Sequence, residues 1–338
     1  MDEGHLLRPF SLSADVKARA YSLPLQRRMT DFGADLSFSR ACEKMKEHYG
    51  ITVPASSMRS ITEDHAEKIK DNEHLQADIP DEGGVECLIA QMDGTMIPIV
   101  DTFDKTDMEG KAIDKRKTRE VRWQEARLTL AHPKGSVSPV YRSTLGDPDE
   151  VGDQLAHCAT LAGMDQHSKV HCVGDGATWI CEQVDRVFGP QGAFLIDFYH
   201  LCDYLAAASK GCAPDQPSAW LEQQKQQMKE NRVFEVLEAL KPHIEPESVS
   251  DKDAPVRRCY RYIKNRLGQF DYKGALEADL PIGCGEVESA HRYVIQERLK
   301  IAGAWWKEDN AQNMLGLRTI RVNNDWDDYW DSLYKKAA

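Results

Sequence analysis

Two short segments of the sequence each place an acidic residue before a glycine at the end of an apolar run. Asp93-Gly94 lies within the run 85–100, and Asp175-Gly176 follows the run 169–173. A glycine removes the Cβ that would crowd its neighbour, so each carboxylate can face an open groove. Two such carboxylates that meet in space would hold a hard cation such as Mg²⁺ or Mn²⁺, because these ions prefer oxygen ligands. Two ordinary Asp-Gly turns are the alternative interpretation.

A third acidic site lies downstream, where Gly283-Cys284-Gly285 precedes a helical pattern that contains Glu286 and Glu288. Residues two apart on a helix point about 200° apart, so only one of these two can face a given neighbour. Carboxylates on two strands and one helix can surround two metal ions about 3.5–4 Å apart, as in-line displacement at phosphorus requires. A ribonuclease H-like sheet gathers its carboxylates in this way.

The elements that would position these residues are strands followed by alternating helices and strands. Strands are predicted at 85–100, 123–132, 137–144, 169–173 and 193–197, with helices at 150–162 and 177–188. This order predicts an α/β fold with a mixed sheet flanked by helices. Residues 201–280 carry no strand pattern and predict an all-helical insertion, with one long helix over 220–240. Residues 281–338 supply the last acidic helix and a helical tail.

The N-terminal part predicts a small helical region. Residues 14–30 are amphipathic, and residues 37–70 read as two helices separated by a turn at 50–54. Such a pair can be a helix-turn-helix whose second helix enters a DNA groove, with Arg59 near its start. A helical hairpin without DNA contact fits the pattern equally. The acidic segment 71–84 marks a boundary, so the expected division is 1–80, 81–200, 201–280 and 281–338.

Composition limits the function classes. The 338 residues carry a net charge of −12, which argues against a general nucleic-acid coat. Positive charge is nevertheless concentrated at 111–127, which includes Lys115, Arg116 and Lys117, and at 255–275; solvated surfaces are the alternative. There is no apolar run long enough for a membrane span and no signal-peptide core, which predicts a cytoplasmic protein. Nine cysteines without a C-x-x-C pair predict reduced thiols rather than a zinc site.

Several motifs in combination resemble a known family. The chain is similar to DDE-type transposases of bacterial insertion sequences, of the ISKra family, related to the Mutator superfamily. The resemblance is close over about 85–338 and looser over 20–70. The matching blocks are Met92-Asp93-Gly94-Thr95, Val173-Gly174-Asp175-Gly176-Ala177-x-Trp179-Ile180, Asp197-Phe198-Tyr199-His200, Pro281-Ile282-Gly283-x-Gly285-x-Val287-Glu288-Ser289, Arg298-Leu299-Lys300-x-x-Gly303-x-Trp305-Trp306 and Leu315-x-Leu317-Arg318.

The resemblance implies roles for individual residues. Asp93 and Asp175 would be catalytic metal ligands for Mg²⁺ or Mn²⁺. Glu288 would be the third, favoured over Glu286 because a small residue follows it in the family. In the Asp197-x-x-His200 motif, the histidine would orient DNA or the site, although a helix-start histidine with a structural role is the alternative.

Residues after the last acidic position would contact DNA. Arg298 and Lys300 are expected to face phosphates. Trp305 and Trp306 are expected to stack on a base, with core packing the better explanation for at least one of them.

The expected function is therefore metal-dependent cleavage and joining of DNA strands at the ends of a mobile element. Its partners would be terminal inverted repeats and target DNA, bound by a homodimer or higher oligomer near the nucleoid. One alternative is a catalytically inactive or domesticated transposase that acts as a DNA-binding protein. Another is a ribonuclease H-like nuclease acting on other nucleic acids.

Overall fold

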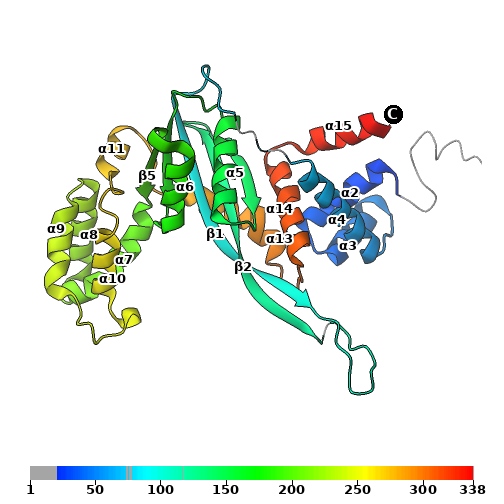
Figure 1. The fold of residues 1–338 in the computed structure, drawn as a ribbon, viewed down its shortest axis with the longest axis horizontal. Coiled ribbons are helices and arrows are strands. Elements are labelled where there is room, and N and C mark those ends of the chain that lie inside the picture. Colours follow the sequence, from blue (N-terminus) through cyan, green and yellow to red (C-terminus); the bar gives the residue numbers. More distant parts are fainter. Residues whose placement is uncertain (1–20, 74, 76–77, 116, 338) are drawn as a thin grey trace, which may run out of the picture.

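A five-stranded mixed sheet forms the centre of the molecule (Figure 1), which is a computed structural model describing residues 21–73, 75, 78–115 and 117–337. The strands are β1 (Cys87–Thr102), β2 (Arg119–Pro133), β3 (Val140–Thr144), β4 (Lys169–Gly174) and β5 (Gly192–Ile196). Their order is β3-β2-β1-β4-β5. The first three strands pair antiparallel, and β4 and β5 add parallel to β1. The predicted strands and the mixed α/β class are thereby confirmed.

Both faces of the sheet are buried. Successive side chains of β1 point to opposite faces, and each set packs in its own apolar core. Leu88, Ala90 and Met92 pack with helices α5 (Pro148–Leu161) and α6 (Thr178–Phe188) on one face. Ile97 and Ile99 belong to the core of the opposite face. A central strand buried on both sides explains why β1 has apolar residues at both odd and even positions.

C-terminal helices cover that opposite face. They are α12 (Gly285–Ala290), α13 (Glu297–Leu299) and α14 (Glu308–Val322), while α15 (Trp326–Ala337) packs against the N-terminal helices through contacts such as that of Tyr329 with His65. A π-helical segment, His291–Gln296, joins α12 to α13. The helical pattern that begins near Glu286 is therefore not one regular α-helix. The π segment has i→i+5 hydrogen bonds in place of i→i+4, which changes which side chains face the sheet after α12.

The segment after β5 is helical and has its own core. It contains α7 (Phe198–Cys212), α8 (Pro217–Lys229), α9 (Val233–Leu240), α10 (Pro255–Lys264) and α11 (Tyr272–Glu277), which together form the helical layer. The prediction of one long helix over 220–240 is wrong. Asn231 has φ of 60°, a left-handed conformation that ends α8 before α9 begins.

Three N-terminal helices are described, α2 (Leu23–Asp35), α3 (Phe38–Tyr49) and α4 (Ala55–Asp71). The two helices predicted within 37–70 are confirmed. The side chain of Ser37 accepts the Arg40 N–H at the start of α3, and Gly50 ends it with φ of 67°. Of the helix predicted over 14–30, residues 14–20 lie outside the described residues.

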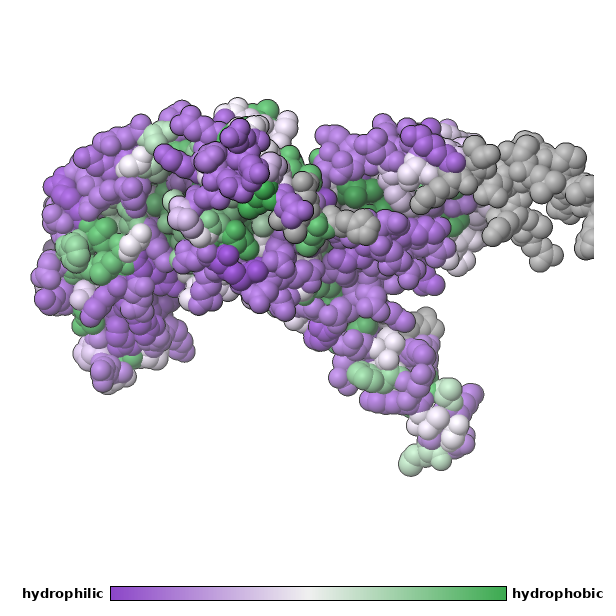
Figure 2. All heavy atoms as spheres, turned by 45° about the horizontal axis from the view of Figure 1, so that its top comes forward, coloured by the Kyte–Doolittle hydropathy of each residue, from purple (hydrophilic) through white to green (hydrophobic). Residues whose placement is uncertain are grey.

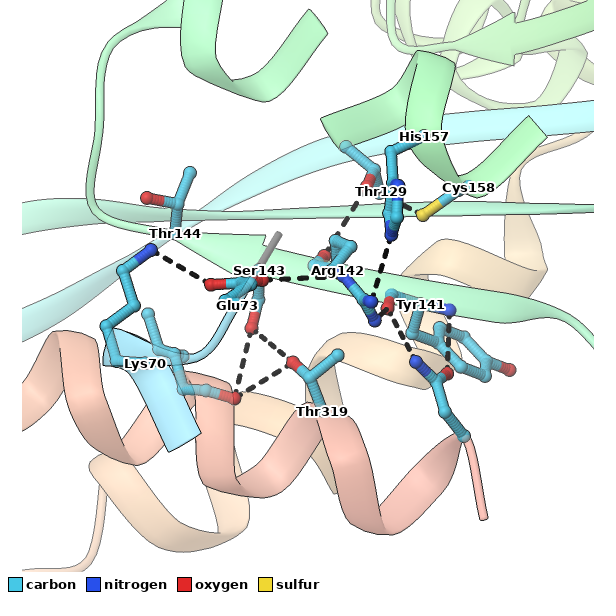
Figure 3. A network of polar contacts seen from close by, with 12 residues as sticks. Lys70, Glu73, Thr129, Tyr141, Arg142, Ser143, Thr144, His157, Cys158 and Thr319 are labelled. Atoms are coloured by element: carbon cyan, nitrogen blue, oxygen red, sulfur yellow. Dashed lines mark hydrogen bonds and ion pairs between the residues drawn. The ribbon is translucent and has the colours of Figure 1, made fainter. Parts of the chain in front are cut away.

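A polar network fixes the end of α4 to the sheet (Figure 3). Lys70 Nζ lies 3.0 Å from Glu73 Oε2, and Glu73 Oε1 lies 3.4 Å from Arg142 Nε on β3. Arg142 Nη2 continues to His157 Nε2 on α5 at 3.0 Å. The N-terminal helices are thus bonded to the sheet layer rather than attached only by the linker.

Strands β1 and β2 extend beyond the helices as a two-stranded arm that projects from the body of the molecule (Figure 1). Two of the basic residues predicted for DNA contact, Lys115 and Lys117, lie in the loop at its tip. Lys115 pairs with Asp104 at 2.9 Å, Lys117 is exposed, and Arg116 lies outside the described residues. Hydrophilic residues cover most of the face drawn in Figure 2. None of the helices in the described part of the chain combines the length and apolar character needed to cross a bilayer.

Candidate functional site

Asp93 lies on β1, and Asp175 directly follows the end of the adjacent strand β4. The β1–β4 register pairs Gln91 with Val173, so the residues two positions further on are neighbours. Adjacent strands are about 4.8 Å apart. Both aspartates belong to the face covered by α12, because side chains two apart share a face. Gln91, on that face, accepts the Val287 N–H through Oε1 at 3.0 Å.

Backbone N–H groups hold both carboxylates in place. Gly94 N–H donates to Asp93 Oδ1 at 2.7 Å, and Ala177 N–H donates to Asp175 Oδ1 at 2.8 Å. Neighbouring side chains occupy the space in which a Cβ on either glycine would lie, so the two glycines do not open a groove beside the carboxylates. A Cβ on Gly94 would approach the Glu125 carboxylate to 2.1 Å. Gly176 has φ of +83°, and a Cβ added there would lie 2.5 Å from Tyr262 Oη.

Glu288 and Glu286 point to different partners, as their helical spacing requires. Glu286 Oε2 lies 2.9 Å from His132 Nε2 on β2. Glu288 instead interacts electrostatically with Asp93, and the Cys284 thiol lies 3.7 Å from its Oε1. Of the two glutamates, Glu288 is therefore the one whose charge acts on Asp93, while Glu286 pairs with His132 on β2.

The site concentrates negative charge. Burial and then the charges of Asp175, Glu288 and Glu125 together raise the pKa of Asp93 to about 6, although the Gly94 N–H lowers it. A carboxyl group with a raised pKa carries its charge at a cost in free energy. A bound cation would offset this cost, so the donor set suits a hard divalent metal ion.

His291 was missed by the sequence reasoning. It lies three residues after Glu288, one helical turn further, which was the available signal. Its Nε2 lies 3.4 Å from Asp93 Oδ2, and its side chain is 3% exposed. Burial, together with the charge of Lys300, lowers the pKa of His291 to about 4, although the interaction with Asp93 raises it. A neutral imidazole therefore contacts the oxygen of Asp93 that the Gly94 N–H does not occupy.

Asp197 joins the start of α7 to the turn before α12. Its Oδ1 accepts the His200 N–H at 2.7 Å, and its Oδ2 accepts the Cys284 N–H at 2.5 Å. Ligand atoms of Asp197, Cys284 and Glu288 lie within 4.8 Å of one another. The Asp-x-x-His spacing is thus that of a helix N-cap, in which Asp197 bonds to the backbone of His200.

The imidazole of His200 is half-buried beside aromatic rings. Its centroid lies 5.7 Å from that of Tyr204 and 6.3 Å from that of Tyr262. These contacts match the helix-start alternative stated for this histidine. They place it in the helical layer rather than on the carboxylates.

Lys300 lies at the site, whereas Arg298 does not. Lys300 is exposed, and its Nζ donates to Thr95 Oγ1 at 2.8 Å. The expectation that Arg298 faces phosphates is wrong. Its side chain is 2% exposed, its Nε–H donates to the Gly33 carbonyl at 2.9 Å, and its guanidinium lies 4.7 Å from the Trp306 ring. Arg298 is a packing residue between α13 and α2.

A groove of about 620 Å³ near α4 is lined by Arg59 and both tryptophans, and Arg298 also lines it. Arg59 is exposed there and lies 3.8 Å from Glu63. Trp305 is 43% exposed, with the Arg119 guanidinium 3.9 Å from its ring. Trp306 is buried, which confirms that at least one of the two tryptophans packs in the core.

Comparison with known proteins connects the site to a family model. The model described as "Uncharacterised protein family (UPF0236)" matches residues 162–328. This range includes Asp175, Asp197 and Glu288 and begins after Asp93. No curated protein matches the chain. The chain is therefore similar to this family over the segment that carries two of the three carboxylates and the whole helical layer.

Proposed function

We propose that this chain is a DDE-type transposase, an enzyme that cleaves DNA strands and joins their ends to a target. The observation that carries the proposal is the grouping of Asp93, Asp175 and Glu288, from β1, the turn after β4 and α12, on one face of the sheet. The strand order β3-β2-β1-β4-β5, with its parallel half, supports a ribonuclease H-like catalytic domain. The blocks shared with the ISKra family support the choice of reaction.

Asp93, Asp175 and Glu288 would hold Mg²⁺ or Mn²⁺. When bound, such ions activate the attacking hydroxyl and stabilise the leaving oxygen of a phosphodiester. Asp93 and Asp175 each use Oδ1 to accept a backbone N–H, which fixes the direction of the carboxylate. This preorganisation avoids the cost of orienting the ligands during the reaction.

The neighbouring residues have separate tasks. His291 stays neutral and limits the freedom of the Asp93 carboxylate through its contact with Oδ2. Lys300 places one exposed positive charge beside the acidic group, where it would attract a phosphate. Arg59, Lys115 and Lys117 would contact DNA away from the site, on α4 and on the arm.

The test is a strand-transfer assay with labelled DNA ends, a plasmid target and Mg²⁺ or Mn²⁺. We expect Asp93→Asn, Asp175→Asn and Glu288→Gln each to lower the rate by at least about 10³-fold, because each removes one metal ligand. Glu286→Gln is the matched control, since it makes the same change two residues away and should keep the activity.

Other products would support the alternative functions. Hydrolysis without joining would identify a nuclease, and metal-independent DNA binding without cleavage would identify a DNA-binding protein. Full activity of Glu288→Gln together with loss in Glu286→Gln would contradict the assignment of the third carboxylate.

A further inference from the structure

Helix α10 of the helical layer presents a strongly basic outer face. Its inner side chains, such as Val256, Cys259 and Ile263, are buried in the layer's core. Arg258 and Arg261 are exposed on the outside. The helix therefore carries positive charge on a surface that the rest of the layer leaves open.

Three guanidinium groups line one hollow of about 240 Å³ on this face. They belong to Arg258, Arg261 and Arg266, and the other lining residues include Asn265 and Tyr262. Arg261 pairs with Asp251 at 2.5 Å. The side chain of Arg258 has neither an ion pair nor a hydrogen bond within the described residues. No acidic side chain of the described chain lines this hollow, so its positive charge is only partly compensated.

Aromatic rings lie beneath these cations. Tyr204 and Tyr262 are stacked, with centroids 4.1 Å apart and planes 15° apart. The Arg258 guanidinium lies 6.0 Å from the Tyr204 ring, and that of Arg266 lies 4.3 Å from the Tyr262 ring. Such contacts hold the planar cations in position.

A second hollow adjoins the first and has a less polar lining. It measures about 230 Å³ and shares Tyr204 and Arg258 with the basic hollow. Ala207, Pro255 and His200 also line it, together with the exposed Asp203, the one acidic residue among the described residues of its lining. A ligand that extends across both would place an anionic group among the arginines and a flatter, less polar group against Tyr204.

The basic hollow is connected directly to the turn that carries Asp175. Tyr262 Oη–H donates to the Asp175 carbonyl at 2.8 Å, and Arg266 Nε–H donates to the Gly176 carbonyl at 2.9 Å. A ligand bound at these arginines therefore lies next to the candidate metal site.

We propose that the two hollows bind one nucleotide unit of a DNA strand that leads into the acidic site. The phosphodiester would lie between Arg258 and Arg266, whose forked N–H groups match phosphate oxygens. The sugar or base would lie against Tyr204, as in proteins that bind single strands by stacking. The inference rests on the proposed function for the nature of the strand, and it assigns DNA contact to residues of the helical layer.

The test measures binding of a fluorescein-labelled single-stranded oligonucleotide by anisotropy, in EDTA and over a range of salt concentrations. Arg258→Ala should weaken binding about tenfold, since a charged hydrogen bond is lost. The slope of log affinity against log salt should fall by about 0.7, the value for one phosphate contact on a single strand. Arg258→Lys should recover part of both losses.

Arg232→Ala is the matched control, because Arg232 lies in the same layer and lines neither hollow. It removes the same charge and should change affinity by less than about twofold. Circular dichroism melts would verify that each variant is folded. Equal effects of Arg258→Ala and Arg232→Ala would overturn the proposal, and so would Arg258-dependent binding of inorganic phosphate without Arg258-dependent binding of DNA.

The experiments distinguish failure of the proposed transposase function from failure of the proposed DNA-binding site. EDTA removes the metal, so DNA binding is measured whether or not the protein cleaves DNA. Arg258-dependent binding without any strand cleavage would refute the proposed function and keep this inference. Strand cleavage that depends on Arg258 and not on Asp175 would also refute the proposed function and keep this inference.

Discussion

Replacing Asp93 with asparagine should stabilise the metal-free protein. The folded state raises the pKa of this carboxyl from 3.8 to about 6, mainly through burial and then through the neighbouring negative charges. Above pH 6 the group is ionised in both the folded and unfolded states, so the folded state carries the full unfavourable free energy. Asparagine removes the charge and can still accept the Gly94 N–H.

The size of the effect follows from the pKa difference. A shift of about two units corresponds to about 3 kcal/mol. The Asp93 side chain is 29% exposed, and screening by water reduces this to about 2 kcal/mol. The penalty decreases as the pH falls through 6, because the folded state then binds a proton. At about pH 5 the difference between the variant and the wild type should be near half its value at pH 7.5.

The assay is urea unfolding of both proteins in EDTA at the two pH values, repeated with Mn²⁺. Asp215→Asn, a change at an exposed aspartate outside the site, should alter the free energy of unfolding by less than about 0.5 kcal/mol. With Mn²⁺ the order should reverse, since a ligand that binds only the folded wild type stabilises it. A less stable Asp93→Asn variant in EDTA, or an equal response of both proteins to Mn²⁺, would refute the reasoning.

Three further predictions concern the stability of the fold. Burial lowers the pKa of His65 from 6.5 to about 4, so its contribution to stability is complete above 6.5 and is lost as the pH falls; between pH 7.5 and 5 the wild type should lose about 2 kcal/mol more than His65→Gln in urea unfolding. Gly176→Ala should cost about 1–3 kcal/mol and lower the melting temperature, because φ is +83° and Tyr262 Oη obstructs the new Cβ. Glu245 accepts the N–H groups of Val256 and Arg257 at the start of α10, so Glu245→Ala should cost about 1 kcal/mol in urea unfolding and Glu245→Gln less.

The sheet could be predicted from sequence because its signals are local. Strand β1 reads as an apolar run, and the glycines at 94 and 176 marked the acidic positions. The N-cap at Ser37 and the stop at Gly50 were likewise visible in short windows. Each of these features depends on residues within a few positions of one another.

The unpredicted features depend on contacts between distant residues. The burial of Arg298 requires Gly33, which lies 265 residues earlier, and a helical arginine otherwise reads as a surface residue. The pairing of Glu286 with His132 spans 154 residues. Asn231 ends α8 through a backbone conformation that a sequence rich in glutamine and lysine does not reveal. In contrast, His291 could have been found from its spacing to Glu288.

The packing of the N-terminal helices has a consequence for synthesis of the chain on the ribosome. Ala34 and Ala66 share a core with Met314 and Leu315 of α14, and Arg318 Nη1–H donates to the Ala34 carbonyl, 284 residues away. The helices that are translated early therefore lack their packing partner until α14 has left the exit tunnel. Glu288 is also translated late. A nascent chain from which α14 has not yet emerged would then lack a docked N-terminal region, and one from which α12 has not emerged would lack the complete group of Asp93, Asp175 and Glu288.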